Sequence, residues 1–176
     1  RRDETSFGKA RPGVQARIKL GMRRDGRITA VDIHAIGDGG PYGRSGDHNN
    51  VGVIGSLAYQ PAAMRMRGTG VYTNTPPRGA QRAPGGEQSM TMLSPIIQKA
   101  AKQLGLDQVD VLKVNAPEGQ ATFGPPLRDG QRSNVTSAFA KEAIDAGAEL
   151  FNWRERVQRS GRRNGSKVTG VGVALS

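Results

Sequence analysis

The sequence contains no cysteine among its 176 residues. Disulfide bonds, thiolate catalysis and cysteine-ligated iron–sulfur clusters are therefore excluded within this chain. Only two histidines are present, His34 and His48, and without cysteine they are too few for a structural zinc site. Because neither lies in a recognised nucleophile–base motif, hydrolytic catalysis is disfavoured.

Aromatic and apolar side chains are also scarce. Phe, Trp and Tyr make up 5 % of the residues and hydrophobic residues 35 %, which is below the usual share for a globular domain. No apolar run reaches about 18 residues, so the sequence predicts no membrane span. The apolar residues that remain are patterned, which argues against disorder. So small a core nevertheless predicts that the chain does not fold robustly alone.

The N-terminal sequence Arg1-Arg2-Asp3-Glu4 has no initiator methionine and no apolar segment behind it. It therefore does not resemble a secretory signal. We expect the chain to be an internal part of a longer protein.

Positive charge is abundant, with 26 Lys+Arg against 15 Asp+Glu and a formal charge of +11. This excess indicates an acidic partner such as nucleic acid, a phosphorylated cofactor or an acidic subunit, or a basic surface without a special partner. Single-strand binding usually adds stacking aromatics to a basic groove, so nucleic acid is disfavoured. Two basic segments, Arg65/Arg67 and residues 162–167, could hold phosphate, but solvated surface is the better interpretation.

The clearest local pattern is a β-hairpin near the N-terminus. Apolar and polar residues alternate over 14–20, an Asp25-Gly26 turn follows, and residues 28–36 form the second strand. The alternation shifts near Thr29–Ala30, which predicts a β-bulge there.

Glycine and proline, 25 and 10 residues, predict long loops over 37–55 and 116–132. Within the first loop, His48 is either an ordinary polar loop residue or a ligand or acid/base group. Residues 63–73 are predicted to form a strand.

Helical spacing of apolar residues predicts a helix over 87–104. Pro95 should kink or restart this helix, and Gly105 should end it. The remaining predicted elements are a short helix over 108–114 capped by Asp107, a longer helix capped by Ser133 or Asn134, a helical stretch over 150–159, and a final strand over 168–175 with Val171 and Val173 inward. Together these elements predict an α+β fold in which antiparallel β-hairpins are packed against several helices.

The most informative segment spans residues 73–88. A strand runs into a bend rich in Pro and Gly that presents Arg78 and Arg82, and a helix then begins. Small residues let backbone N–H groups approach a ligand closely, and a helix start adds a partial positive charge. The segment could therefore hold an oxyanion or a phosphate. The alternative is a structural corner, since the pattern is not a general nucleotide fingerprint.

Residues 79–88, Gly-Ala-Gln-Arg-Ala-Pro-Gly-Gly-Glu-Gln, resemble the Arg-Gly loop of the molybdenum hydroxylases, the xanthine dehydrogenase and aldehyde oxidase family. Five further segments resemble family segments in the same order along the chain: residues 11–30, 71–76, 101–115, 147–156 and 170–174. The resemblance covers nearly the whole chain.

The resemblance implies an internal fragment of the molybdopterin-binding large subunit. By position, the residues implied to bind the molybdenum–molybdopterin, with or without an added nucleotide, are Gly79, Ala80, Gln81, Arg82 and Gln88. Backbone N–H groups of this loop would approach the molybdenum–dithiolene group. The resemblance assigns no catalytic residue and no direct metal ligand within the chain.

The implied reaction is hydroxylation of an aldehyde or heterocyclic C–H with water-derived oxygen. Electrons would leave through iron–sulfur clusters and FAD held on other domains or subunits. The implied partners are these redox components, the remainder of the large subunit and a small-molecule substrate. The implied compartment is the cytoplasm, with the periplasm as the alternative.

Departures from the family pattern limit these expectations. Pro84 stands where some members carry a substrate-sandwiching aromatic, which makes an aldehyde or another activated C–H at least as good a substrate as a purine. Ser94-Pro95 replaces an acidic position in the following helix. The family's upstream Gly-rich loop and downstream glutamate base are not in this sequence, so we expect the isolated chain to be catalytically incompetent.

Residues 1–132 would form the first part of the molybdopterin-binding region, with the hairpin, the loop and a helix pair. Residues 133–176 would form a helix–strand segment leading into the next subdomain. Two other functions stay open from sequence: a basic module that binds nucleic acid or another polyanion, and a structural domain that keeps the family fold without contacting the cofactor.

Overall fold

The computed structural model describes residues 10–42 and 46–175; the N-terminal Arg1–Glu4 lies outside them. In chain order, the elements are β1 (Val14–Met22), β2 (Ile28–Asp38), the 3-10 helix η1 (Gly40–Tyr42), α2 (Asp47–Tyr59), β3 (Ala63–Val71), α3 (Gly86–Leu104), α4 (Gln108–Asn115), β4 (Glu118–Phe123), β5 (Ser133–Phe139), α5 (Ala140–Leu150), α6 (Trp153–Arg159), β6 (Arg163–Asn164) and β7 (Lys167–Val168). This mixture of helices and antiparallel strand pairs confirms the α+β prediction.

The N-terminal hairpin forms as the alternation predicts. β1 pairs antiparallel with β2, and the register passes from Gly21 opposite Ala30 to Met22 opposite Ile28. Thr29 is therefore an extra residue in β2, which confirms the predicted bulge. At the turn, Gly26 has a φ of 86°, a left-handed conformation that glycine adopts without strain.

β3 lies on the other side of β2 and is parallel to it, so the sheet order is β1-β2-β3. Parallel neighbours need a crossover connection, and α2 lies in the segment between them. The prediction of a loop over residues 37–55 was therefore wrong, because α2 begins at Asp47. Its glycines serve close packing: a Cβ on Gly52 would lie 2.7 Å from Met66, and one on Gly55 would lie 2.5 Å from Leu93.

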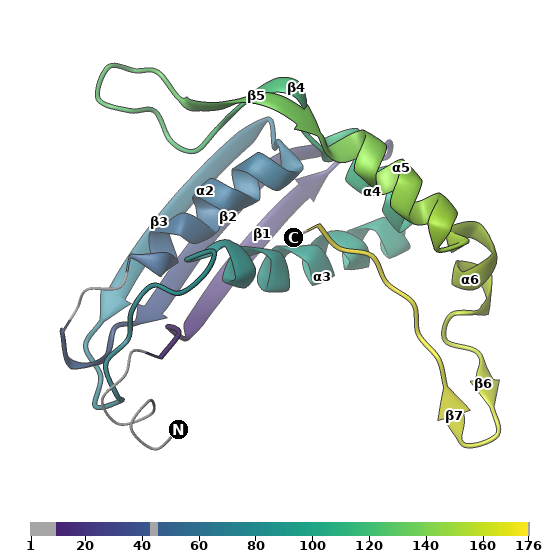
Figure 1. Cartoon of the computed structure of the whole chain (residues 1–176), viewed down its shortest axis with the longest axis horizontal. Coiled ribbons are helices and arrows are strands. Elements are labelled where there is room, and N and C mark those ends of the chain that lie inside the picture. The colour runs from purple at the N-terminus through teal and green to yellow at the C-terminus, as the bar shows by residue number, and fades with distance from the viewer. Residues whose placement is uncertain (1–9, 43–45, 176) are drawn as a thin grey trace.

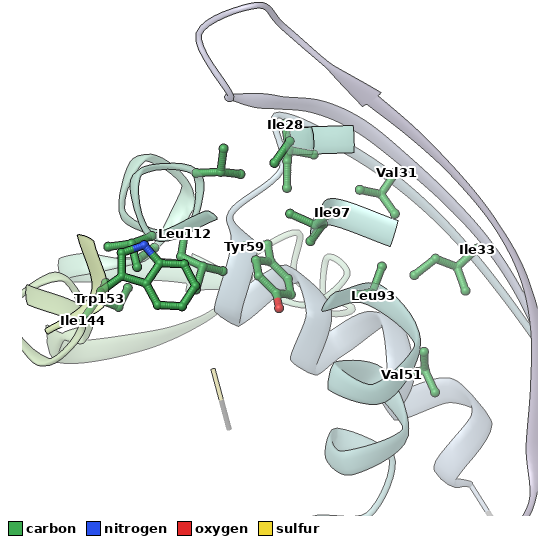
Figure 2. Packing of buried hydrophobic residues seen from close by; sticks show 14 of the residues in the cluster. Ile28, Val31, Ile33, Val51, Tyr59, Leu93, Ile97, Leu112, Ile144 and Trp153 are labelled. Carbon is green, nitrogen blue, oxygen red and sulfur yellow. The ribbon is translucent and has the colours of Figure 1, made fainter. Parts of the chain in front are cut away.

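Helices α2 and α3 cover one face of the sheet (Figure 1). In the core, Val31 and Ile33 of β2 face Leu93 and Ile97 of α3 (Figure 2). Val51 of α2 belongs to the same buried cluster. Helix α3 includes Pro95 and ends at Gly105, whose φ is 70°. The predicted helix and its glycine stop are thus confirmed.

The second half differs from the sequence prediction. Residues 116–132 contain β4, and residues 133–139 form β5 rather than the start of a helix. The β-branched and aromatic residues of 135–139 favour a strand, and long-range pairing with β4 outweighs the capping signal at Ser133. Helix α5 begins only at Ala140. The helical stretch over 150–159 is shorter than predicted, because α6 starts at Trp153.

The predicted final strand over 168–175 is also wrong, because only Lys167–Val168 pairs, as β7, with β6. The chain then runs back to α3 as an extended segment (Figure 1). Val171 and Val173 are half-buried against the core, as predicted, and Gln98 of α3 donates a hydrogen bond to the Val173 carbonyl.

Helix α4 is joined to the hairpin by one buried amide. Asp107 caps α4 by accepting from the Val109 N–H at 2.7 Å, as predicted. At the other end, Asn115 Oδ1 accepts from the Ile28 N–H, and its Nδ2 donates to the carbonyls of Gly26 and Val111, each at 2.8 Å. The turn of the hairpin is thus held by a side chain almost 90 residues away in sequence.

Replacing Asn115 with Ala should lower the free energy of unfolding by about 3 kcal/mol, because the buried Ile28 N–H and Gly26 carbonyl lose their partner. Urea-induced unfolding followed by circular dichroism measures the change. Asn134→Ala, on an exposed position of β5, is the matched control and should change the value by less than about 0.5 kcal/mol. Equal effects of the two substitutions would contradict the role given to Asn115.

Candidate functional site

The segment between β3 and α3 is a loop at one end of the three-stranded sheet. Of the residues predicted to bind a cofactor, Ala80, Gln81 and Arg82 are exposed, Gly79 is buried, and Gln88 is half-buried in the first turn of α3. The loop therefore does not lie in a filled interior, and its tip is open to a ligand.

A single carboxylate holds the start of the loop. Asp38, at the end of β2, accepts hydrogen bonds from the hydroxyls of Thr73 and Thr75 and from the Gly40 N–H, the last at 3.0 Å. Its Oδ2 also lies 3.0 Å from Nη2 of Arg78. The Thr73 hydrogen bond, supported by Gly40, Thr75 and the Arg78 charge, holds the pKa of Asp38 below its ordinary value of 3.8.

The chain before β1 holds the middle of the loop. The Ala10 N–H donates to the Pro77 carbonyl and the Gly79 N–H to the Ala10 carbonyl, both at 3.1 Å. Arg11 donates to the Arg82 carbonyl at 2.9 Å and pairs with Glu87 at 3.0 Å. The Gly79 N–H is thus already used within the protein.

The loop tip carries unused polar groups. Within the described part of the chain, the backbone N–H groups of Ala80, Arg82 and Ala83 donate to no acceptor. Gln88 Nε2 donates to the Pro12 carbonyl at 3.3 Å, but its Oε1 is buried with no partner among the described residues. An unpartnered buried carbonyl is costly, so this oxygen is available to a donor on a ligand.

Two helices begin beside the loop. Gly85 ends the loop with a φ of 76°, and a Cβ there would lie 2.5 Å from the Asp47 carbonyl oxygen in the first turn of α2. Asn50 of the same helix donates to the Pro84 carbonyl at 3.1 Å. Since α3 starts at the next residue, the N-terminal ends of α2 and α3 both add partial positive charge near the loop. The arrangement favours an anionic ligand.

A mostly apolar cavity of about 950 Å³ adjoins the far side of the loop. The loop contributes Ala83 and Pro84 to its wall, α2 and α3 contribute most of the rest, and residues 172–175 close one side. Such walls suit apolar surface rather than a charged group.

His48 is not a loop residue but part of α2, and it is 8 % exposed. A Cβ on Gly37 or Gly70 would lie 2.9 Å from its side chain. The imidazole therefore occupies the space that these two glycines, which have no side chain, leave open beside β2 and β3. Its Nδ1 has no partner within residues 10–42 and 46–175. The same residues contain no group of three or more His, Cys, Asp or Glu that could hold a metal ion.

The basic segments lie apart from the loop. Arg65 and Arg67 share the outer face of β3, as predicted, and Arg65 pairs with Asp32. Residues 162–167 form the exposed β6–β7 hairpin. Sequence reasoning missed Asp38, Arg11 and Asn50, because each acts through a contact with a distant part of the chain. The only signal was the polar Asp38-Gly39-Gly40 sequence at the end of a predicted strand.

In sequence comparisons, residues 1–116 match the family model of the molybdopterin cofactor-binding domain. The putative xanthine dehydrogenase molybdenum-binding subunit XdhA of Escherichia coli (strain K12) is 30 % identical over 89 % of this chain and 20 % of its own length. The nicotinate dehydrogenase large molybdopterin subunit of Eubacterium barkeri is 30 % identical over 74 % of this chain and 30 % of its own length. The chain therefore spans only a fifth to a third of these curated relatives.

Solved structures share the fold. The aldehyde oxidoreductase from Desulfovibrio gigas superposes with a TM-score of 0.69 at 22 % identity, over 91 % of this chain and 17 % of that one. Quinoline 2-oxidoreductase from Pseudomonas putida 86 gives a TM-score of 0.67 at 22 % identity, over 84 % of this chain and 19 % of that one.

Asp38→Asn should lower the free energy of unfolding by about 2 kcal/mol above pH 4, because it removes the charge that accepts from Thr73, Gly40 and Thr75 and pairs with Arg78. The folded-state pKa of Asp38 is depressed, so the stabilisation is present above the ordinary value of 3.8 and is lost as the pH falls through the folded value. The difference from the unsubstituted protein should therefore shrink below pH 3.8.

Urea unfolding at a series of pH values measures this dependence. Asp110→Asn, at an exposed position of α4, is the control and should show little loss at any pH. A deficit for Asp38→Asn that does not shrink in acid would show that the charge of Asp38 is not what holds the loop.

Proposed function

Since this chain belongs to the molybdopterin cofactor-binding domain family, we propose that it supplies part of the molybdenum–molybdopterin site of a larger oxidoreductase subunit. The observation that carries the proposal is the 79–88 loop. The N–H groups of Ala80, Arg82 and Ala83 in this loop have no acceptor among the described residues, two helix N-termini lie beside it, and Asp38 and Arg11 hold it in place.

The residues present fit such a group. A molybdopterin carries a phosphate and a dithiolene with negative charge, and the N–H groups of Ala80 and Arg82 together with the Arg82 guanidinium are donors for anionic atoms. The pterin ring carries N–H donors, for which the unpartnered Gln88 Oε1 is an acceptor. We propose Gly79, Ala80, Gln81, Arg82 and Gln88 as the cofactor-binding residues, with Gly79 acting by fixing the loop rather than by donating.

When bound, the molybdenum cofactor supplies the redox chemistry of hydroxylation with water-derived oxygen. The chain's residues bind and orient it. Asp38, through Thr73, Thr75 and Arg78, fixes where the loop leaves β3. Arg11 fixes the Arg82 carbonyl, while the N–H groups of Arg82 and Ala83 have no acceptor among the described residues. Fixed dipoles of this kind cost no reorganisation when a charged group arrives.

The rest of the enzyme would lie outside these residues. The sequence has no cysteine, so iron–sulfur clusters, and with them FAD, would be held by other domains or subunits, and the general base by the remainder of the large subunit. We propose that the substrate is an aldehyde or a heterocycle that is hydroxylated at a C–H bond. Pro84, which stands where some family members have an aromatic side chain, does not select between the two. The compartment we propose is the cytoplasm. No helix in the described residues combines the length and apolarity of a membrane crossing.

The alternative of a polyanion-binding module gains no support from the relatives, whose names describe molybdenum enzymes. The division of the chain at residue 132 stays a proposal, and the pairing of β4 with β5 joins residues on the two sides of it.

Arg82→Ala in the complete large subunit should lower the molybdenum content at least about fivefold, because a charged donor to the cofactor is lost at the loop tip. Metal analysis and release of the oxidised, fluorescent pterin measure the two parts of the cofactor. Arg82 is exposed and only its carbonyl is bonded within the described residues, so the unfolding midpoint should change little.

Arg128→Ala, at an exposed position between β4 and β5, is the matched control and should leave the cofactor content unchanged. If Arg82→Ala retained full molybdenum content and turnover, the loop would have a structural role only. Loss of content together with a large drop in the unfolding midpoint would point to misfolding, and Arg82→Lys, which keeps the charge, would then have to restore the content.

A further inference from the structure

The face of the three-stranded sheet that points away from α2 and α3 is strongly basic. Side chains alternate between the two faces of a strand, and buried Val31 and Ile33 face the helices (Figure 2). The strand register places Arg17, His34 and Arg67 in one row across β1, β2 and β3, and Lys19, Asp32 and Arg65 in the next. We call these six residues the basic face.

Four cations on this face surround one carboxylate. Asp32 is paired with Arg65, whose Nε lies 3.0 Å from its Oδ1, and this contact lowers the pKa of Asp32. Arg17, Lys19 and Arg67 form no ion pair in the described part of the chain. Arg17 and Lys19 lie two residues apart on β1, and Arg67 lies on β3, on the other side of β2. The face therefore carries an excess of positive charge that a complementary surface would neutralise.

One face of the sheet is covered by helices and the other is open. The sheet is mixed, with the antiparallel pair β1–β2 and the parallel pair β2–β3, and purely parallel sheets almost always have both faces covered. Among the described elements, α2 and α3 lie on the inner face and no helix lies on the outer one (Figure 1). Ile36 of β2, next to the basic rows, is 41 % exposed between Gln15 and Thr69. A surface that covers the charged rows would therefore also contact this apolar side chain.

We propose that the basic face docks a carboxylate-rich protein surface provided by the remainder of the same large subunit. The proposal rests on the proposed function, because it requires the chain to be part of that subunit. The curated relatives are three to five times longer than the matched region. In a subunit of that length, other segments of the same polypeptide could cover the basic face. A surface in the same polypeptide acts at high effective concentration.

Charge decides the chemistry of the partner. Arg65 is already paired with Asp32, so the other three cations, Arg17, Lys19 and Arg67, need carboxylates opposite them to avoid burying unpaired charge. Among the described residues, the basic face and its strand neighbours carry no Phe, Tyr or Trp side chain, so the large stacking platform typical of single-strand nucleic-acid binding is missing there.

Arginine-directed labelling of the complete subunit with phenylglyoxal, read by peptide mass spectrometry, tests whether the face is covered. Rates are taken as the ratio of native to urea-unfolded protein at each arginine. Arg17 and Arg67 should react at least about tenfold more slowly in the native subunit, because labelling then needs local opening. Native rates close to the unfolded ones at both positions would overturn the proposal. So would protection that appears only after a separate subunit, or DNA, is added.

The double substitution Arg17→Glu/Arg67→Glu tests the charge of the covering surface. It should lower the unfolding midpoint of the complete subunit by about 5 °C or more in about 50 mM salt, and by less in about 0.5 M salt, because carboxylates would then face carboxylates. Arg24→Glu/Arg27→Glu, at the exposed turn of the same hairpin, makes the same change in charge and should shift the midpoint by less than about 2 °C.

Equal shifts for the two double variants, or a shift of the sheet-face variant that salt does not reduce, would overturn the proposal. Arg17→Lys/Arg67→Lys keeps the charge and should restore the midpoint; a failure to do so would also contradict an electrostatic contact. Molybdenum content, measured in parallel, separates this result from the proposed function, since Arg82→Ala tests the cofactor site without touching the basic face.

Discussion

The geometry of the candidate site depends on the carboxylate of Asp38. Its position at the end of β2 is set by the sheet register, and from there it binds Thr73, Thr75 and Arg78 of the outgoing loop as well as the Gly40 N–H. The position of the loop is therefore set by its contacts with the sheet. Arg11 and Asn50 then fix the Arg82 and Pro84 carbonyls, while the N–H groups of Ala80, Arg82 and Ala83 have no acceptor among the described residues. A preorganised donor array of this kind is what an anionic cofactor requires.

Local patterns in the sequence were enough to predict some elements but not others. The hairpin with its bulge, helix α3 with its glycine stop and the Asp107 cap each depend on residues within a few positions, and all were confirmed. The resemblance to the molybdenum hydroxylases was confirmed by family membership. Helix α2 was missed because Gly52 and Gly55 were interpreted as loop residues, although they allow Met66 and Leu93 to approach the helix. β4 and β5 were missed because the Pro and Gly residues of 116–132 and the capping signal at Ser133 were given more weight than the strand propensity of residues 135–139, which pairing with β4 satisfies.

The candidate site shows the same division. The loop with its exposed tip was predictable from small residues before a helix start, as was its likeness to a known cofactor loop. The groups that hold it were not, because Asp38 lies 40 residues from Arg78 and Arg11 lies 71 from Arg82. A single sequence contains no pattern from which contacts between residues so far apart can be predicted. The assignment of the five cofactor residues stays a prediction, to which the structure adds that the Gly79 N–H is already bonded to Ala10.

The modest apolar content of the chain has a structural counterpart in the surfaces it leaves open. Leu150 is 90 % exposed, and the cavity between α2 and α3 is walled mainly by apolar atoms although residues 172–175 already occupy one side. A free-standing domain would lose stability by leaving such surface in water, whereas a segment of a large subunit can bury it against its neighbours. The outer face of the sheet is also open among the described residues, but it is charged rather than apolar. The two kinds of surface lie on opposite sides of the same sheet, so the helix side would be covered by apolar packing and the outer side by carboxylates, with the 79–88 loop at the end of the sheet left free for the cofactor.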